Sequence, residues 1–177
     1  MGKLRTIQTG VTIHASREQV WEALYTRFGD VHLYNPSLDG SHFIKGGSGA
    51  VGCERQCDLD AKTRLIERII RAEELTSFTV EIIGGNMPMV KTMIIDIELQ
   101  QHSPSLTSVS LTGRYSTSPS FMGGLVKGMM RNKLSDMLIG LKYFLETGTA
   151  VTKKSYKPIA KMYHRLTQQQ AFSIAGR

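Results

Sequence analysis

Hydrophobic and polar positions change period several times along this chain, and each change indicates a different kind of element. Apolar and polar residues alternate over Leu4–His14, which predicts a first β-strand. Ser16 and Gln19 then have the spacing of a capping box, so a helix is expected directly after this strand. A second short helix is predicted over Val31–Asn35, and Pro36 ends it.

The period changes to two after this helical pair and remains two for most of the chain. Breaks rich in glycine, serine and proline separate the alternating segments. The predicted strands are Ser41–Lys45, Ala50–Leu59, Thr63–Glu73, Phe78–Ile83, Met89–His102 and Thr107–Thr117. Consecutive strands with short links form an antiparallel sheet, so we expect seven strands in one such sheet.

The last strong pattern is a long helix over Phe121–Glu146. Its apolar residues recur at helical spacing, and Gly148 follows where a C-terminal cap belongs. At roughly 39 Å this helix is the only predicted element long enough to cross the sheet. The fold class is therefore α+β, with a curved seven-stranded antiparallel sheet wrapped around a long C-terminal helix and two short helices after the first strand. A curved sheet that grips one helix leaves space between them, which is the first indication of function.

Charge divides the chain into two parts. The 177 residues carry a net charge of +7, but residues 148–177 hold six Lys or Arg and no Asp or Glu, which leaves +1 for residues 1–147. We therefore predict a ligand-binding domain over residues 1–147 and a basic extension over residues 148–177. Apolar residues at rough helical spacing over Val151–Phe172 favour a helix in this extension. Such a tail is suited to an anionic membrane, to nucleic acid or to another protein, or else it is a solvated extension. Nucleic acid is not expected as a partner of the body.

Several features bear on compartment and on chemistry. An apolar run long enough to span a bilayer is absent, and Lys3 and Arg5 are followed by a strand pattern instead of an apolar signal core. Cys53 and Cys57 lie on one predicted strand about 13 Å apart, too far for a disulfide. We therefore expect a cytoplasmic protein with two free, buried cysteines.

Motifs for cofactors and metals give no strong signal. Residues 47–52 satisfy G-x-G-x-x-G, but they lead into a strand instead of a helix, which indicates a glycine-rich hairpin. The five histidines are scattered, and known metal-ligand spacings are absent. No cofactor and no metal are expected.

Polar residues on apolar faces are the more informative pattern. The period of two directs Arg55, Lys91 and Tyr115 inward, whereas it leaves the facing of Glu67 and Lys45 open. A charge among apolar neighbours is costly unless it is paired or hydrated. Either Arg55 and Glu67 form a buried pair, or strand ends expose these side chains to solvent, or they line a wet cavity that orients a ligand.

Methionine is abundant near the predicted cavity, where its flexible side chain suits an adaptable wall as well as an ordinary core. The candidate ligand-binding residues are Lys45, Arg55, Glu67, Met89, Lys91, Tyr115, Met130 and Leu134.

Several short stretches resemble a known superfamily. The order of elements over residues 5–147 resembles the helix-grip fold of the START-like superfamily (SRPBCC, birch-pollen-allergen-like), whose opening strand runs into a helix bearing Val-Trp, as at Val20-Trp21. Residues 42–45, 51–55, 66–68 and 82–85 are similar to stretches of plant abscisic-acid receptors and of bacterial proteins of the polyketide cyclase/dehydrase or lipid-transport type.

This resemblance implies roles for individual residues. Lys45 becomes the cation facing a ligand carboxylate, Glu67 and Tyr115 become polar wall residues that act through water, and Arg55 borders the cavity. The receptors' Ser-Gly-Leu-Pro gate is replaced by Asp58–Lys62, and their His-Arg-Leu latch is replaced near Met87–Met89. The resemblance therefore implies the cavity without the hormone-sensing switch.

The expected function is binding of a small hydrophobic or amphipathic molecule between the sheet and the C-terminal helix. Access is expected through loops near Asn35–Leu38, Asp58–Lys62 and Gly85–Met89. The alternative is an enzyme resembling polyketide cyclases and dehydratases, with Glu67, Tyr115 or Arg55 assisting proton transfer in the same cavity.

Overall fold

The computed structural model describes residues 4–86 and 89–163. Its seven strands are β1 (Arg5–Ile13), β2 (Gly40–Lys45), β3 (Glu54–Asp58), β4 (Arg64–Glu73), β5 (Ser77–Gly85), β6 (Val90–Ser103) and β7 (Leu106–Thr117). Its helical elements are α1 (Arg17–Trp21), η1 (Glu22–Thr26), η2 (Phe28–Leu33), η3 (Ser120–Met122) and α2 (Gly123–Thr147). The fold is the predicted α+β helix-grip arrangement, with short helices after the first strand and a long helix after the last.

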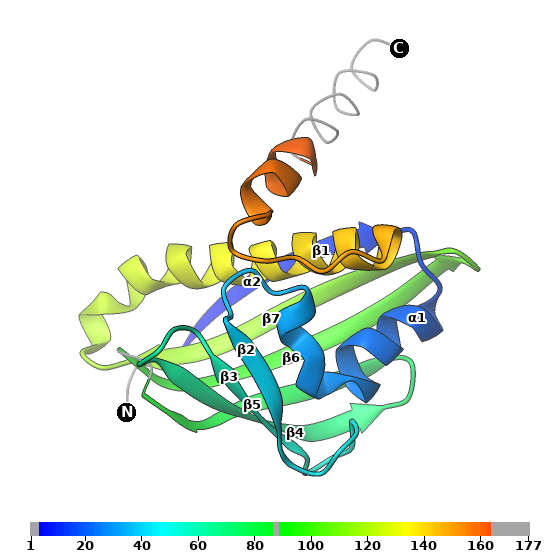
Figure 1. Cartoon of the computed structure of the whole chain (residues 1–177). Coiled ribbons are helices and arrows are strands. Elements are labelled where there is room, and N and C mark those ends of the chain that lie inside the picture. Colours follow the sequence, from blue (N-terminus) through cyan, green and yellow to red (C-terminus); the bar gives the residue numbers. More distant parts are fainter. Residues whose placement is uncertain (1–3, 87–88, 164–177) are drawn as a thin grey trace.

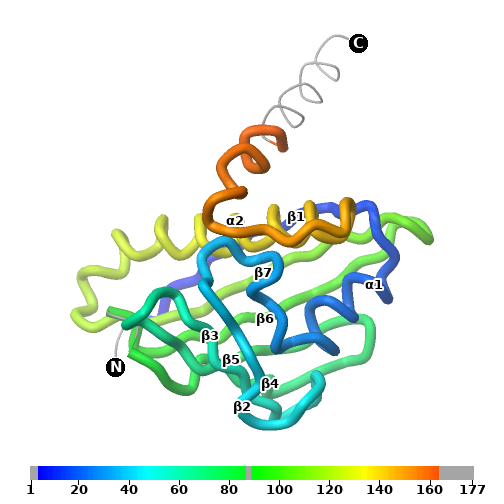
Figure 2. The backbone as a smooth tube through the Cα atoms, in the orientation of Figure 1, coloured from blue at the N-terminus to red at the C-terminus, as the bar shows by residue number. Residues whose placement is uncertain are grey.

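All seven strands form one antiparallel sheet in the order β1-β7-β6-β5-β4-β3-β2. The first strand pairs with the last, so the helical segment from α1 to η2 carries the chain from one edge of the sheet to the other. Figure 1 shows the curved sheet with α2 along one side of its concave face and α1 at one end. The tube in Figure 2 follows the same path.

The helix α2 covers only part of that face. It packs mainly against β1 and to a smaller extent against β7, the strands at one edge of the sheet. Two side-chain contacts join α2 to β1: the hydroxyls of Ser135 and Thr9 are 2.7 Å apart, and Lys142 donates to the carbonyl oxygen of Thr12 at 2.8 Å. The inner faces of the strands farther along the sheet are therefore left facing a space that α2 borders without filling.

Close backbone approach fixes the position of α2 relative to the loop after η2. A Cβ added at Gly140 would lie 1.9 Å from the carbonyl oxygen of Tyr34, so only glycine allows this contact. At its C-terminus the helix ends on Gly148, which has the left-handed conformation (φ 73°) predicted for a cap.

The third predicted strand was too long. Residues 46–53 form a turn-rich link in which Gly46 and Gly52 have positive φ, and β3 begins only at Glu54. Val51, which alternation directed inward, is consequently 58% exposed. The glycines interrupt the pleat, so alternation cannot be extended through them. The G-x-G-x-x-G segment thus lies between two strands, and Cys53 and Cys57 are free and buried as expected.

The described part of the C-terminal extension packs on the body. Residues 156–163 are helical. The amide of Val151 donates to the carbonyl oxygen of Leu33 at 2.8 Å, and the Tyr156 hydroxyl donates to Asp136 on α2 at 2.5 Å. The helix therefore begins later than the predicted start at Val151, and the predicted segment from residue 164 onward, including Arg165, lies outside the described residues. Within the described residues, no helix is long and apolar enough to cross a membrane.

Candidate functional site

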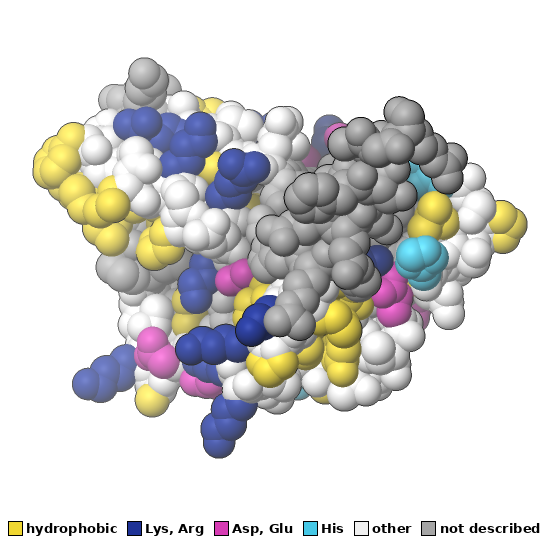
Figure 3. Space-filling model, turned by 90° about the horizontal axis from the view of Figure 1, so that it is seen from above, with side chains coloured by type: hydrophobic (Ala, Val, Ile, Leu, Met, Phe, Trp, Pro, Cys, Tyr) yellow, Lys and Arg dark blue, Asp and Glu magenta, His cyan; other side chains and the backbone are white. Residues whose placement is uncertain are grey.

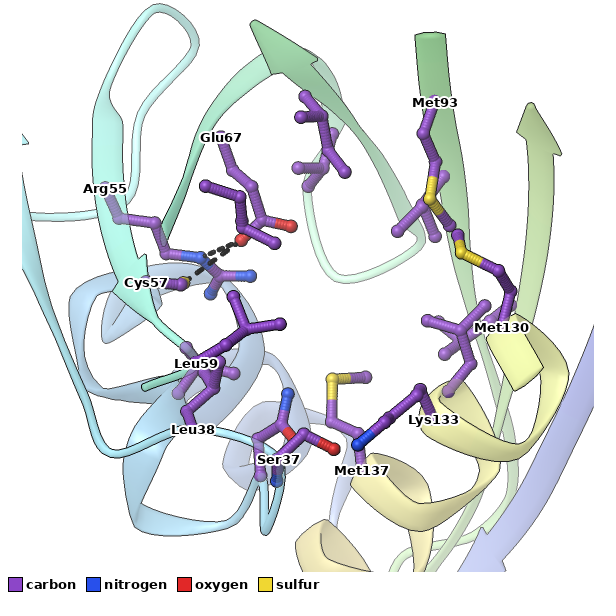
Figure 4. Close-up of a pocket in the computed structure, with 18 of the residues that line it drawn as sticks. Ser37, Leu38, Arg55, Cys57, Leu59, Glu67, Met93, Met130, Lys133 and Met137 are labelled. Carbon is purple, nitrogen blue, oxygen red and sulfur yellow. Dashed lines mark hydrogen bonds and ion pairs between the residues drawn. The ribbon is translucent and has the colours of Figure 1, made fainter. Parts of the chain in front are cut away.

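A cavity of about 350 Å³ lies between α2 and the uncovered part of the concave face. Figure 4 shows side chains from the strands and from α2 pointing into this common space. Its walls comprise Leu24, Phe28, Val31, Tyr34, Asn35, Ser37, Leu38, Arg55, Cys57, Leu59, Thr63, Leu65, Glu67, Phe78, Val80, Ile82, Met89, Val90, Met93, Ile95, Ile97, Leu111, Met129, Met130, Lys133, Leu134 and Met137.

The apolar walls follow directly from the two periodicities of the chain. Every second residue over Phe78–Ile82 of β5 and Met93–Ile97 of β6 faces the cavity, and residues three or four apart on α2 do the same. The strand residues are Phe78, Val80, Ile82, Met93, Ile95 and Ile97, and the helix residues include Met130, Leu134 and Met137. Methionines on both sides give the space walls that can change shape around a ligand.

The polar exception is a buried cluster on β3 and β4. Arg55 and Glu67 are directly opposite in the register of these strands, and Arg55 Nε lies 2.6 Å from Glu67 Oε2. The Cys57 thiol donates to the same carboxylate oxygen at 3.3 Å. Arg55 also donates through Nη1 to the carbonyl oxygen of Phe28 at 2.7 Å, and its guanidinium lies 3.7 Å from the centroid of the Phe28 ring. Figure 4 shows this cluster on one side of the cavity, opposite Met93 and Met130.

Mutual pairing keeps these charged groups stable in a largely apolar environment. The side chains of Arg55 and Glu67 are each only 9% exposed. Burial is the largest single influence on the pKa of Arg55 and lowers it. The Glu67 carboxylate, its hydrogen bond to Arg55, and the neighbouring Cys57 and Tyr34 together outweigh burial and raise the pKa, so the guanidinium remains charged. Burial, and then the Glu67 carboxylate, raise the pKa of the Cys57 thiol, so it stays protonated and acts as a hydrogen-bond donor.

The cavity reaches the surface where its walls are exposed. Met89 is 37% exposed and Met129 is 47% exposed, and Lys133 is also exposed beside them. Lys133 extends from α2 toward the side of the cavity where Ser37 lies (Figure 4). Among the described residues it has no ion-pair partner, so its ammonium group is available at this opening.

All three loops predicted to give access contribute to the wall. Asn35, Ser37 and Leu38 come from the loop after η2, Leu59 comes from the β3–β4 loop, and Met89 precedes β6. The predicted segment near Met87 and Pro88 lies outside the described residues.

The structure brings five of the eight predicted site residues to this cavity. These are Arg55, Glu67, Met89, Met130 and Leu134. The face of β4, which alternation left open, is the one that directs Glu67 inward. Of the three interpretations of Arg55 and Glu67, exposure to solvent at strand ends is wrong, because each side chain is only 9% exposed. The two residues form a buried pair and also line the cavity, and a role in orienting a ligand stays a prediction.

The other three residues lie elsewhere, and two of them are displaced by β-bulges. The pairing of β2 with β3 shifts between Phe43 and Lys45, which places Lys45 opposite Glu54 on the outer face. Its side chain is 66% exposed and its Nζ lies 3.7 Å from Glu54 Oε1. A similar shift between Val90 and Thr92 makes Lys91 the extra residue, so Val90 faces the cavity and Lys91 is exposed.

Tyr115 points inward as predicted but does not line the cavity. It lies on β7 close to the beginning of α2, and its side chain is fully buried there. Its hydroxyl donates to the carbonyl oxygen of Gly123 at 2.8 Å. The polar wall role implied by the resemblance is therefore wrong for Tyr115, because the helix covers this strand.

Lys133 is the functional candidate that the sequence interpretation missed. It lies four residues after Met129 and four before Met137, which is the spacing of one helix face. That spacing alone would have placed a cation beside the methionines of the cavity wall.

Comparison with known proteins identifies the family. The family model for polyketide cyclase/dehydrase and lipid transport matches residues 5–142. The chain belongs to this family. No curated protein sequence matches it.

Solved structures share the fold. A START superfamily protein from Mycobacterium smegmatis superposes with a TM-score of 0.69 at 15% identity, covering 81% of this chain and 99% of that one. Ara h 8.0201 superposes with a TM-score of 0.67 at 12% identity, with 82% and 99% covered. Norcoclaurine synthase from Thalictrum flavum, in complex with dopamine and hydroxybenzaldehyde, gives 0.62 at 13% identity, with 85% and 91% covered. This family member therefore shares the START-like helix-grip fold.

Proposed function

We propose that this protein binds a small amphipathic molecule in the cavity between α2 and the sheet. The observation that carries the proposal is a cavity of about 350 Å³ with apolar walls, a buried ion pair on one side and, at its opening, a lysine without an ion-pair partner among the described residues. This volume lies within the range of small-molecule sites in proteins. Membership of the family and the hydrophobic character of the walls support the same class of ligand.

Burial of the apolar part of the ligand supplies most of the affinity. At about 25 cal/mol per Å², a ligand that buries about 300 Å² of apolar surface gains roughly 7 kcal/mol before the costs of association. Arg55 and Glu67 are engaged with each other, so they offer a ligand only their remaining hydrogen-bonding positions. Lys133 is the cation that a carboxylate, sulfate or phosphate group at the opening would meet first.

Ligand binding is favoured over catalysis by the same contacts. The enzyme alternative requires an acid or base free to exchange a proton with substrate. Here Glu67 already accepts hydrogen bonds from Arg55 and Cys57, and the Tyr115 hydroxyl donates to the backbone. A related fold holds small aromatic molecules in norcoclaurine synthase, which supports a similar size of ligand for this cavity.

The test measures binding of an anionic fluorescent probe, 1-anilinonaphthalene-8-sulfonate, to the full chain. Ile95→Trp fills the cavity and should weaken probe binding by at least about tenfold, because the larger side chain occupies the ligand's space. Ile94→Trp places the same group on the opposite face of β6 and should leave binding unchanged. Thermal unfolding of both variants verifies that they are folded. Equal probe binding by the two variants would contradict the proposal.

Lys133→Gln tests the orientation of the ligand. Removal of the ammonium group should weaken the sulfonate probe by about tenfold. An uncharged probe of similar size, N-phenyl-1-naphthylamine, should bind the variant and the original protein equally. Loss of both probes would show that Lys133 supports the cavity wall instead of recognising an anion.

A further inference from the structure

Exposed apolar side chains gather at the end of the molecule where α2 begins. Phe121 in η3 is 80% exposed, and Leu125 and Met129, one turn apart on α2, are 73% and 47% exposed. Figure 3 looks down on α2 and shows hydrophobic and basic side chains together at its left-hand end. Large apolar residues grouped on a surface indicate contact with a partner or a membrane.

The charge around these residues has one sign. Lys127, Arg131 and Lys133 lie on the first turns of α2, and residues 118–135 contain no Asp or Glu. At about 100° per residue, Leu125 and Met129 lie along one edge of the exposed helix face, and Lys127 and Arg131 lie along the other. Between these edges lie Gly124 and Gly128, where an added Cβ would meet nothing within 4 Å. The helix can therefore approach a flat surface closely with both edges in contact.

This entrance surface (Phe121, Leu125, Lys127, Met129, Arg131 and Lys133) is continuous with the cavity opening. Met129 and Lys133 belong to both. The amide of Ser118 donates to the carbonyl oxygen of Met89 at 3.0 Å, which holds the exposed Met89 beside the segment that leads into η3. An object seated on the entrance surface would thus lie at the mouth of the cavity.

We infer that the entrance surface docks on an anionic lipid bilayer. Phe121, Leu125 and Met129 enter the boundary between headgroups and acyl chains, and Lys127 and Arg131 contact lipid phosphates. The combination of projecting apolar side chains with an unbroken positive charge matches such a membrane. Docking in this orientation points the cavity opening at the bilayer, so an apolar ligand passes between them without crossing water. The inference is independent of which ligand the cavity holds.

The test is co-sedimentation of the full chain with vesicles that contain no added ligand. The protein should bind phosphatidylcholine vesicles that contain one third phosphatidylglycerol at least about tenfold more tightly than pure phosphatidylcholine vesicles. Binding should weaken as salt is raised, because exposed charges are screened.

Two pairs of substitutions separate the apolar and the basic contributions. Phe121→Ser with Leu125→Ser should weaken binding by at least about tenfold, whereas Ile44→Ser with Val51→Ser, which also removes two exposed apolar side chains, should not. Lys127→Glu with Arg131→Glu should weaken binding similarly. The control with the same charge change is Lys154→Glu with Lys157→Glu, on exposed residues of the C-terminal extension. Stronger loss in this control would place the membrane contact on the extension and overturn the inference.

A labelled variant gives a second measurement that needs no loss of binding. Leu125→Cys carries an environment-sensitive fluorophore, and labelling is selective because Cys53 and Cys57 are buried. Emission should shift to the blue when anionic vesicles are added, and a label at Val51→Cys should not shift. Failure to bind anionic vesicles, an unshifted label at position 125, or self-association that the Phe121→Ser/Leu125→Ser variant abolishes would each overturn the inference.

Discussion

At the scale of single residues, the Arg55–Glu67 pair shows how a charged group is retained in an apolar wall. The two side chains face each other across β3 and β4, and the neighbouring register pair, Glu54 and Arg68, lies on the outer face of the same strands. Arg68 Nη2 lies 2.8 Å from Glu54 Oε1, with the Arg68 side chain 39% exposed. The protein thus carries one buried and one exposed version of the same cross-strand pair.

This pairing predicts different costs for the two faces. Arg55→Met should lower the free energy of unfolding by about 3 kcal/mol, because it leaves the Glu67 carboxylate buried without its cation. Arg68→Met, on the outer face, should cost less than about 1 kcal/mol. Arg55→Met combined with Glu67→Leu should recover most of the loss, since no unpaired charge remains. Urea denaturation measures all three variants, and equal costs for the two arginine substitutions would contradict the prediction.

At the scale of elements, the position of α2 decides whether a cavity exists. The helix packs on β1 and β7 and leaves the inner faces of β5 and β6 uncovered. Gly140 holds it against the loop after η2, which itself contributes Asn35, Ser37 and Leu38 to the cavity wall. The placement of one helix therefore links the stability of the fold to the shape of the site.

Two glycines on α2 should respond oppositely to alanine. Gly140→Ala should destabilise the protein by about 1–3 kcal/mol, because the new Cβ would lie 1.9 Å from the Tyr34 carbonyl oxygen. Gly128→Ala meets nothing within 4 Å and should stabilise it by up to about 1 kcal/mol through helix propensity. Thermal and urea unfolding give both values. If Gly140→Ala were also stabilising, the close approach of helix and loop would be wrong.

At the scale of the whole molecule, the C-terminal extension connects the loops around the cavity. Lys153 Nζ lies 2.7 Å from Asp39 Oδ1 and donates to the carbonyl oxygen of Leu59 at 2.6 Å. Asp39 follows the loop after η2, and Leu59 belongs to the β3–β4 loop. One side chain from the extension thus joins two loops that line the cavity.

Loss of this connection should appear in the dynamics of the loops. Lys153→Ala should increase amide hydrogen exchange in residues 35–39 and 59–62, because these loops lose their shared partner. The melting temperature should change little, since the Lys153 and Asp39 side chains are 45% and 53% exposed. Lys154→Ala, at the exposed neighbouring residue, is the control and should leave exchange unchanged. Equal exchange in both variants would mean that the extension does not brace the loops.

Most of the architecture could be predicted from the sequence, because period-two and helical patterns record which side of each element is buried. The sequence was sufficient to predict seven antiparallel strands and the long closing helix with its Gly148 cap. It was also sufficient to predict that Arg55, Met130 and Leu134 lie at the cavity. The resemblance to the superfamily added Glu67, whose face the pattern had left open. These features depend on local alternation and spacing, which the chain carries in order.

The details of the site depend on contacts that sequence patterns do not record. A bulge in β2, where it pairs with β3, directs Lys45 outward, and a bulge in β6, where it pairs with β7, directs Lys91 outward. A bulge depends on how a strand pairs with its neighbour. Helix α2 lies over Tyr115 and separates it from the cavity. The same helix places Lys133 at the cavity opening. Strand register and helix placement arise from contacts between distant segments, so they alone determine which of the inward residues meet a ligand.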